Sequence, residues 1–229
     1  PVSNPATVLE DAGAQTIAGW ATGMSAGPAD EAGQTLSFVV TGNTNPGLFS
    51  AAPAIDATTG DLTYTPADNA NGSANITIEL RDNGGTTDGG VDTSVPQTFT
   101  ITVTGVNDVP SFTSGGNQTV LEDSGVQTFA GWATAISKGP ADEAGQAVDF
   151  IVSNDNNALF SSQPAISAAG TLTFTPAANA NGTATVTVRI HDDGGTDNGG
   201  MDTSAPQTFT ITVTAVNDAP SFNPVSNPA

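Results

Sequence analysis

The strongest constraint on the fold of this chain is that its sequence repeats itself. The octapeptide Gly-Pro-Ala-Asp-Glu-Ala-Gly-Gln at residues 27–34 recurs at residues 139–146, 112 positions later. A nonapeptide rich in threonine, Pro-Gln-Thr-Phe-Thr-Ile-Thr-Val-Thr, occurs at residues 96–104 and again at residues 206–214, displaced by 110 positions. Self-similarity at a fixed period is the signature of tandem modules, so the sequence predicts two copies of one domain in its 229 residues.

The boundary between the copies is marked by a pentapeptide. Val-Asn-Asp-Val-Pro at residues 106–110 returns as Val-Asn-Asp-Ala-Pro at residues 216–220. We therefore expect repeat 1 over residues 1–109 and repeat 2 over residues 110–229. The sequence PVSNPA both opens and closes the chain, so we expect the last residues to begin the leader of a following repeat in a longer array.

Within each copy, apolar residues alternate with threonine. Phe99, Ile101 and Val103 fall on one face of an extended segment and threonines on the other. Period-two alternation indicates strands with one buried and one solvated face, and no segment has helical spacing. The fold class is thus all-β, a sandwich like that of immunoglobulins. For the first copy we expect seven strands, near residues 2–9, 15–22, 35–41, 48–55, 61–65, 74–81 and 97–106.

Composition excludes several functions. The chain carries 3 basic and 23 acidic residues, a net charge of -20, so it has no basic patch for nucleic acid or for an anionic membrane surface. No apolar run approaches the ~18 residues of a membrane span, so we expect no membrane insertion. We also expect no enzymatic activity. A G-x-S-x-G nucleophile motif occurs at Gly23, Ser25 and Gly27, and we regard it as a chance match. The motif functions on a strand-to-helix turn beside a histidine, whereas the single histidine, His191, belongs to the other copy.

The acidic residues fall at matching positions of predicted turns, which points to a metal ion. Successive strands of a sandwich run in alternating directions, so the acidic turns are expected at both ends of each copy. Two copies joined end to end should therefore meet through like charges. Two carboxylates ~4 Å apart at an effective dielectric constant of ~20 repel by roughly 4 kcal/mol, so we expect a cation between them. Ca²⁺ suits a set of carboxylate and amide oxygens. The expected ligands at this junction are Glu10, Asn107, Asp108, Asp142, Glu143, Asp192 and Asp193.

Two alternatives to this metal site remain open. Any single acidic turn residue has a simpler explanation, because Asp and Asn favour turns by bonding their own backbone amides. A second, local ion is also conceivable in the loop that contains Asp82, Asp88 and Asp92, although this loop lacks the spacing of an EF-hand.

The motifs together resemble a known family. Leu-Glu-Asp near the start of each copy, Asp-Asn-Gly-Gly or Asp-Asp-Gly-Gly at residues 82–85 and 192–195, and the closing Val-Asn-Asp-(Val/Ala)-Pro are similar to bacterial cadherin-like tandem repeats, akin to VCBS-type and other Ig-like repeats. The resemblance implies seven-stranded Greek-key sandwiches, Ca²⁺ at module junctions, and a place in a large secreted or cell-surface adhesion protein. On this resemblance, Glu10 and the pair Asn107 and Asp108 match the base and linker ligands.

The functional expectation is a Ca²⁺-binding spacer or adhesion module, extracellular or on the bacterial cell surface, in which the ions stiffen the junction. Its partners would be neighbouring repeats of the same chain and a surface glycan or protein ligand. The alternative is a glycan- or ligand-binding accessory module of a secreted enzyme. Exposure of Trp20 or Trp132 in a groove would favour that alternative, whereas a buried sandwich tryptophan is the default expectation.

Overall fold

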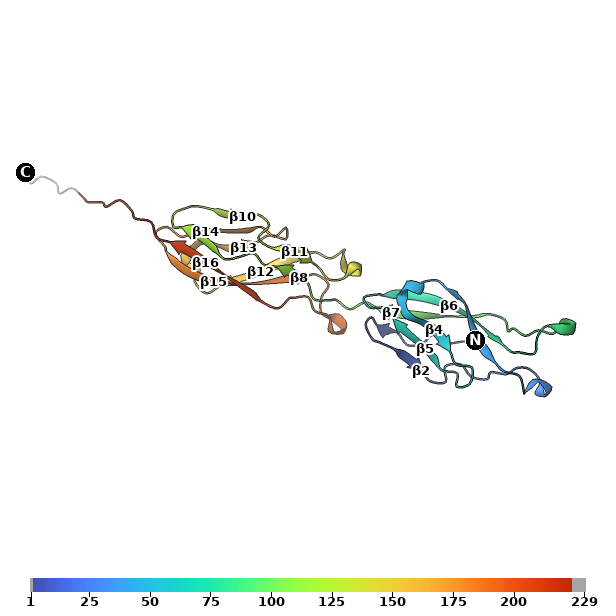
Figure 1. Cartoon of the computed structure of the whole chain (residues 1–229). Coiled ribbons are helices and arrows are strands. Elements are labelled where there is room, and N and C mark those ends of the chain that lie inside the picture. The colour runs from blue at the N-terminus through green and yellow to red at the C-terminus, as the bar shows by residue number, and fades with distance from the viewer. Residues whose placement is uncertain (1, 224–229) are drawn as a thin grey trace, which may run out of the picture. The chain divides into compact units, whose positions relative to one another are not determined.

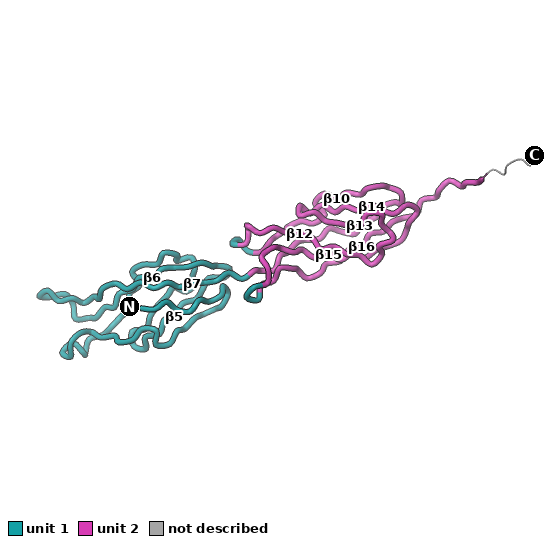
Figure 2. Tube along the Cα trace, turned by 180° about the vertical axis from the view of Figure 1, so that it is seen from behind, with its two compact units in different colours: residues 1–106, 140–142, 197–199 teal, residues 107–139, 143–196, 200–229 magenta. Residues whose placement is uncertain are grey.

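A computed structural model describes residues 2–223, and they form two compact all-β units (Figure 2). Of the described residues, unit 1 contains 2–106 and unit 2 contains 107–139, 143–196 and 200–223. Two short segments, Pro140–Asp142 and Asp197–Gly199, are grouped with unit 1. The boundary between residues 109 and 110 stays a prediction about the sequence repeats. The PVSNPA sequence at residues 224–229 lies outside the described residues.

Unit 1 is a sandwich of a four-stranded sheet and a three-stranded sheet (Figure 1). The first sheet has the order β1-β7-β6-β3 and the second has the order β2-β5-β4. The buried residues of both sheets form one hydrophobic core. The strands are β1 (Val8–Leu9), β2 (Gln15–Ile17), β3 (Ser37–Asn43), β4 (Phe49–Ile55), β5 (Leu62–Pro66), β6 (Gly72–Arg81) and β7 (Gln97–Thr104).

Unit 2 repeats this architecture and adds a short pair of strands. Its sheets have the orders β12-β15-β16-β9 and β10-β14-β13, and β8 pairs with β11 alone. The strands are β8 (Ser111–Thr113), β9 (Gln118–Leu121), β10 (Gln127–Phe129), β11 (Thr134–Ser137), β12 (Val148–Asn154), β13 (Phe160–Ile166), β14 (Leu172–Pro176), β15 (Gly182–Asp192) and β16 (Gln207–Thr214).

The alternation of apolar residues with threonine produces the core as expected. In β7, Phe99, Ile101 and Val103 are each at most 2% exposed, while the threonines between them face outward. In β3 the burial is less complete: Val40 is 37% exposed, and the register against β6 shifts just after it, between Val40 and Gly42.

One pairing differs from an all-antiparallel sandwich. In each unit, two neighbouring strands of the four-stranded sheet run parallel, and they are the first and the last of that sheet along the chain. These pairs are β1 with β7 and β9 with β16. A parallel pair needs a long crossover between its strands, and here the rest of the unit provides it.

The connections between strands include six single-turn 3-10 helices, and no α-helix occurs in residues 2–223. Accordingly, no helix within the described part of the chain is long and apolar enough to cross a membrane. The 3-10 helices are η1 (Ala29–Glu31), η2 (Pro46–Leu48), η3 (Thr87–Gly89), η4 (Ala141–Glu143), η5 (Asn157–Leu159) and η6 (Asp197–Gly199).

Candidate functional site

The linker residue Asn107 is held firmly inside unit 2. Its Nδ2 donates to Asp192 Oδ1 at 3.0 Å and to the Met201 carbonyl at 3.0 Å. Its Oδ1 accepts from Gln146 Nε2 at 2.7 Å, and its carbonyl accepts from the Met201 amide at 2.8 Å. We call Gln146, Asp192 and Met201 the asparagine seat. Every hydrogen-bonding group of the Asn107 amide is engaged there, so this residue fixes the start of unit 2.

Glycine is required beside the seat. A Cβ on Gly194 would overlap Asn107 Oδ1, and a Cβ on Gly200 would lie 3.0 Å from Asn107 Cβ. The Asp-Asp-Gly-Gly turn after β15 therefore has a packing role, because only glycine lets the linker approach so closely.

Two carboxylates are buried here, one of the seat itself and one beside it. Asp192 is 1% exposed and Glu143 is 6% exposed. Asp192 Oδ1 accepts from Gly194 N at 2.9 Å as well as from Asn107, whereas its Oδ2 is buried without a hydrogen-bond partner in the described structure. Glu143 Oε1 accepts from the Asp108 amide at 2.7 Å. A buried carboxylate oxygen is costly unless it is compensated, so this place is chemically suited to a hard cation.

The fit to an ion is partial. Within residues 2–223, no group of three or more Asp, Glu, His or Cys side chains is gathered closely enough to hold a metal. A cation here would therefore draw on Asp192 and Glu143 together with backbone carbonyls and water, which Ca²⁺ accepts with loose geometry.

The carboxylates of Asp193 and Glu10 accept hydrogen bonds from backbone amides. Asp193 Oδ1 accepts from Ala147 N at 2.7 Å, which ties the turn after β15 to the start of β12. Glu10 is 4% exposed, and its Oε1 accepts from Val106 N at 2.6 Å. Its counterpart in unit 2, Glu122, holds Val216 N in the same way at 2.6 Å. Both contacts have an evident structural function, because they secure the chain just after the last strand.

Of the seven expected ligands, unit 2 brings together Asn107, Asp108, Glu143 and Asp192, and places Asp193 in the adjoining turn. Glu10 belongs to unit 1, and Asp142 is the last residue of the short segment grouped with unit 1. The contribution of these two residues to an ion site stays a prediction. Gln146, which holds the Asn107 side chain, was not among the expected residues. Its recurrence in the repeated octapeptide was the available signal.

His191, near the end of β15, pairs with acidic neighbours. Its Nδ1 lies 2.8 Å from Asp149 Oδ1, and its Nε2 lies 3.8 Å from Asp202 Oδ2. The hydrogen bond to Asp149 raises the pKa of His191 above its ordinary value, and the charges of Asp149, Asp202 and Asp192 act in the same direction. With its side chain 37% exposed, it is a surface residue.

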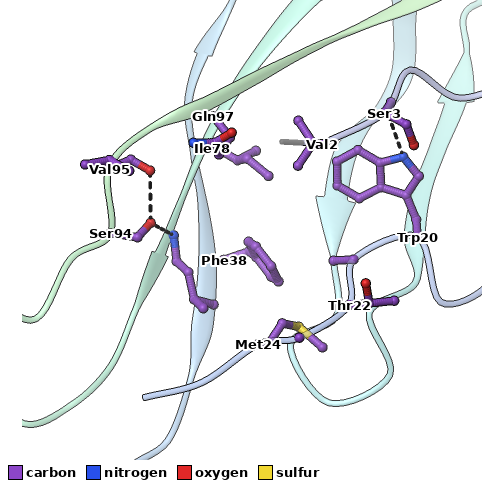
Figure 3. Close-up of a pocket in the computed structure, with 13 residues that line it drawn as sticks. Val2, Ser3, Trp20, Thr22, Met24, Phe38, Ile78, Ser94, Val95 and Gln97 are labelled. Carbon is purple, nitrogen blue, oxygen red and sulfur yellow. Dashed lines mark hydrogen bonds between the residues drawn. The ribbon is translucent and has the colours of Figure 1, made fainter. Parts of the chain in front are cut away.

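The two tryptophans differ in their exposure. Trp132 is 5% exposed and packs on Phe209 with a ring-centroid distance of 4.3 Å. Trp20 packs on Phe99 at 4.4 Å but is only half-buried, and it borders a groove of about 440 Å³ in unit 1 (Figure 3). The default expectation of a buried tryptophan therefore holds for the second repeat and only in part for the first.

Comparisons with known proteins support the fold. The chain is similar to the crystal structures of human protocadherin-24 EC1-2: one has a TM-score of 0.53 and 17% identity, with 93% of this chain and 95% of that chain covered. The other has a TM-score of 0.51 and 18% identity, with 94% and 95% covered. A family model described as a lipoprotein associated domain matches residues 34–108. No curated protein sequence is detectably similar to the chain. The fold is thus cadherin-like.

Proposed function

We propose that this chain is a calcium-binding spacer of an extracellular or bacterial surface adhesion protein, built from two cadherin-like repeats. The observation that carries the proposal is the buried Asp192 beside the linker. An uncompensated carboxylate oxygen at this place, in a chain of charge -20, favours a divalent cation as the missing partner. The cadherin-like fold supports a structural function, and the bacterial type of the repeats rests on the sequence motifs alone.

The linker contacts suggest what the ion would do. Asn107 donates to Asp192, and the Asp108 amide donates to Glu143. A cation held by these two carboxylates would therefore stabilise the attachment of the linker to unit 2. Glu10 and Asp142 complete the ligand set in this proposal, and the ion would restrict bending at the linker. Repeats of the same chain are then the immediate partners, and the chain performs no catalysis.

A calcium titration tests this proposal. Extracellular Ca²⁺ modules bind with Kd around 10⁻⁴–10⁻³ M, so isothermal calorimetry of the full chain should detect binding in this range. Asp192→Asn should weaken the binding at least tenfold. Asp155→Asn is the matched control, because it removes one charge from unit 2 while its amide oxygen still accepts from Thr185 N, and it should bind like the parent. Equal affinities of the two variants, or no binding by the parent at millimolar Ca²⁺, would refute the site.

The glycan-binding alternative depends on an available tryptophan face. Trp132 is buried, and the indole N–H of Trp20 already donates to the Ser3 carbonyl at 3.0 Å. Trp20 is also half-buried and packed on Phe99, so only part of its ring faces the groove, which does not favour the glycan alternative.

A further inference from the structure

Four asparagines of the chain are followed directly by glycine: Asn71, Asn83, Asn181 and Asn198. In such a pair the backbone nitrogen of the glycine can attack the side-chain carbonyl carbon of the asparagine and close a ring. Glycine favours this reaction because it has no Cβ to hinder the approach and leaves the backbone free to rotate. In a folded protein the reaction also requires that neither the side chain nor the glycine nitrogen is held in place.

Asn83 is held at both of its reacting groups. Its Oδ1 accepts a hydrogen bond from Thr35 N at 2.8 Å. The nitrogen that would attack, Gly84 N, donates to Asp82 Oδ1 at 2.8 Å. Ring closure at this position would require both hydrogen bonds to break, so the fold protects this asparagine.

Asn71 and Asn181 occupy matching positions in the two repeats and are held by a sheet. The glycine after each of them is the first residue of a long strand, β6 or β15, and is paired with the neighbouring strand. Each side chain also donates to a buried glutamate. Asn71 Nδ2 lies 3.3 Å from Glu10 Oε2, and Asn181 Nδ2 lies 3.4 Å from Glu122 Oε2. Part of a sheet would have to open before either asparagine could react.

Asn198 has none of these restraints. It is the middle residue of the single 3-10 turn η6, it is exposed, and its side chain forms no hydrogen bond within residues 2–223. Its backbone is left-handed, with φ 58° and ψ 17°, so the turn must open before Gly199 N can reach the side chain. Isolated turns with few buried contacts open far more readily than paired strands do. Gly199 and Gly200, which follow, give the backbone the freedom to rotate.

The first repeat shows that a carboxylate is accepted at this position. The counterpart of Asn198 is Asp88, the middle residue of η3, and its φ of 57° is nearly the same. Asp88 is exposed as well, so exposure is a property of this turn in both repeats. An aspartate at position 198 therefore needs no change in the course of the chain.

We propose that Asn198 is a site of spontaneous deamidation and that the fold protects the other three asparagines. The bond from Gly199 N to Asn198 Cγ forms and the Cγ–Nδ2 bond breaks. Nδ2 leaves as ammonia together with the proton of Gly199 N. Water then opens the resulting succinimide at one of its two carbonyls. One opening gives an aspartate, and the other gives an isoaspartate, in which the main chain runs through the former side chain. Either product adds one negative charge to the loop.

The same loop holds the linker, so the modification has a structural consequence. Met201 N donates to the Asn107 carbonyl at 2.8 Å, and the Met201 carbonyl accepts from Asn107 Nδ2 at 3.0 Å. An isoaspartate lengthens the backbone by one carbon just before these contacts. It should therefore loosen the asparagine seat, whereas an aspartate keeps the ordinary backbone and should leave the seat intact.

Storage of the full chain in mildly alkaline buffer, followed by peptide mass spectrometry, tests the site. Each deamidation replaces an NH₂ group by OH, and the modified peptide identifies the asparagine. Modification at Asn198 should be at least tenfold faster than at Asn71, Asn83 or Asn181. In guanidinium chloride, where the fold no longer distinguishes them, the four rates should become similar. The proposal is overturned if the four asparagines react alike in the folded chain, or if the same order of rates persists in denaturant.

Two variants separate the new charge from the altered backbone. Asn198→Gln should form no acidic species on ion-exchange chromatography during storage, because glutamine would have to close a larger ring and reacts far more slowly. Asn198→Asp carries the charge on an ordinary backbone, and Asp88 shows that this turn accepts it. Hydrogen exchange at the Met201 amide should be faster in the isolated isoaspartate form than in Asn198→Asp. An acidic species that forms equally in Asn198→Gln would overturn the site, and equal exchange in the two forms would overturn its effect on the seat.

Discussion

Replacing Asn107 with alanine should selectively weaken unit 2. The substitution removes three side-chain hydrogen bonds, to Asp192 Oδ1, the Met201 carbonyl and Gln146 Nε2. A neutral intramolecular hydrogen bond contributes about 1 kcal/mol net, and one to a charged group about 1.5–3 kcal/mol. Asp192 Oδ1 still accepts a hydrogen bond from Gly194 N, so its carboxylate loses only one of two donors. The free energy of unfolding of unit 2 should fall by about 3–4 kcal/mol.

Asn217→Ala provides the matched control. Asn217 has the same place in the repeated pentapeptide, but its one described side-chain hydrogen bond goes to the Asp218 carbonyl at 3.1 Å on an exposed segment. Its replacement should change stability by less than about 0.5 kcal/mol. Urea unfolding would measure the loss, and hydrogen exchange at the amides of Met201 and Ser204 would assign it to unit 2. Equal effects of the two substitutions, or a loss confined to unit 1, would refute the importance of the seat.

Three further outcomes are expected. Phe112→Ala should lower the stability of unit 2 by about 3–5 kcal/mol in urea unfolding, because it empties a core position; a loss below 1 kcal/mol would contradict the packing of β8. Gly194→Ala should displace the Asn107 side chain, visible as lost protection of the Met201 amide in hydrogen exchange, and unchanged protection would argue against the close approach. The raised pKa of His191 means that its pairing with Asp149 contributes stability that is complete below pH 6.5 and is lost as pH rises through the folded-state pKa. His191→Gln should therefore cost up to about 1 kcal/mol in acid and nothing in alkali, and a pH-independent cost would oppose this assignment.

The alternation of apolar residues allowed most of the fold to be predicted, because burial on one face leaves a period of two in the sequence. The expected strand at residues 2–9 was the least accurate. Unit 1 has only Val8–Leu9 there, and unit 2 likewise has only β9 (Gln118–Leu121) in the equivalent stretch, residues 114–121. In unit 2, Gly115 precedes this strand and lies so close to Trp132 that a Cβ would come within 2.6 Å of it. Such a tertiary approach leaves no trace in a local pattern.

The sequence was enough to predict most residues of the candidate site, but not the groups to which each of them bonds. Asn107 and Asp192 could be paired from the order of strands and loops, since both fall at the same end of the second sandwich. The bonds of Glu10 and Asp193 to backbone amides could not be distinguished from metal ligation, because acidic residues of turns serve both purposes.

The parallel pairing of β9 with β16 has a consequence under tension. A pull on both ends of unit 2 acts on the start of β9, at Gln118, and on the finish of β16, at Thr214. Since these strands run side by side in the same direction, the load slides one along the other, and all four paired positions must give way together rather than one after another. Unit 1 has only two such positions, between β1 and β7, so it should be the first to yield when the molecule is stretched.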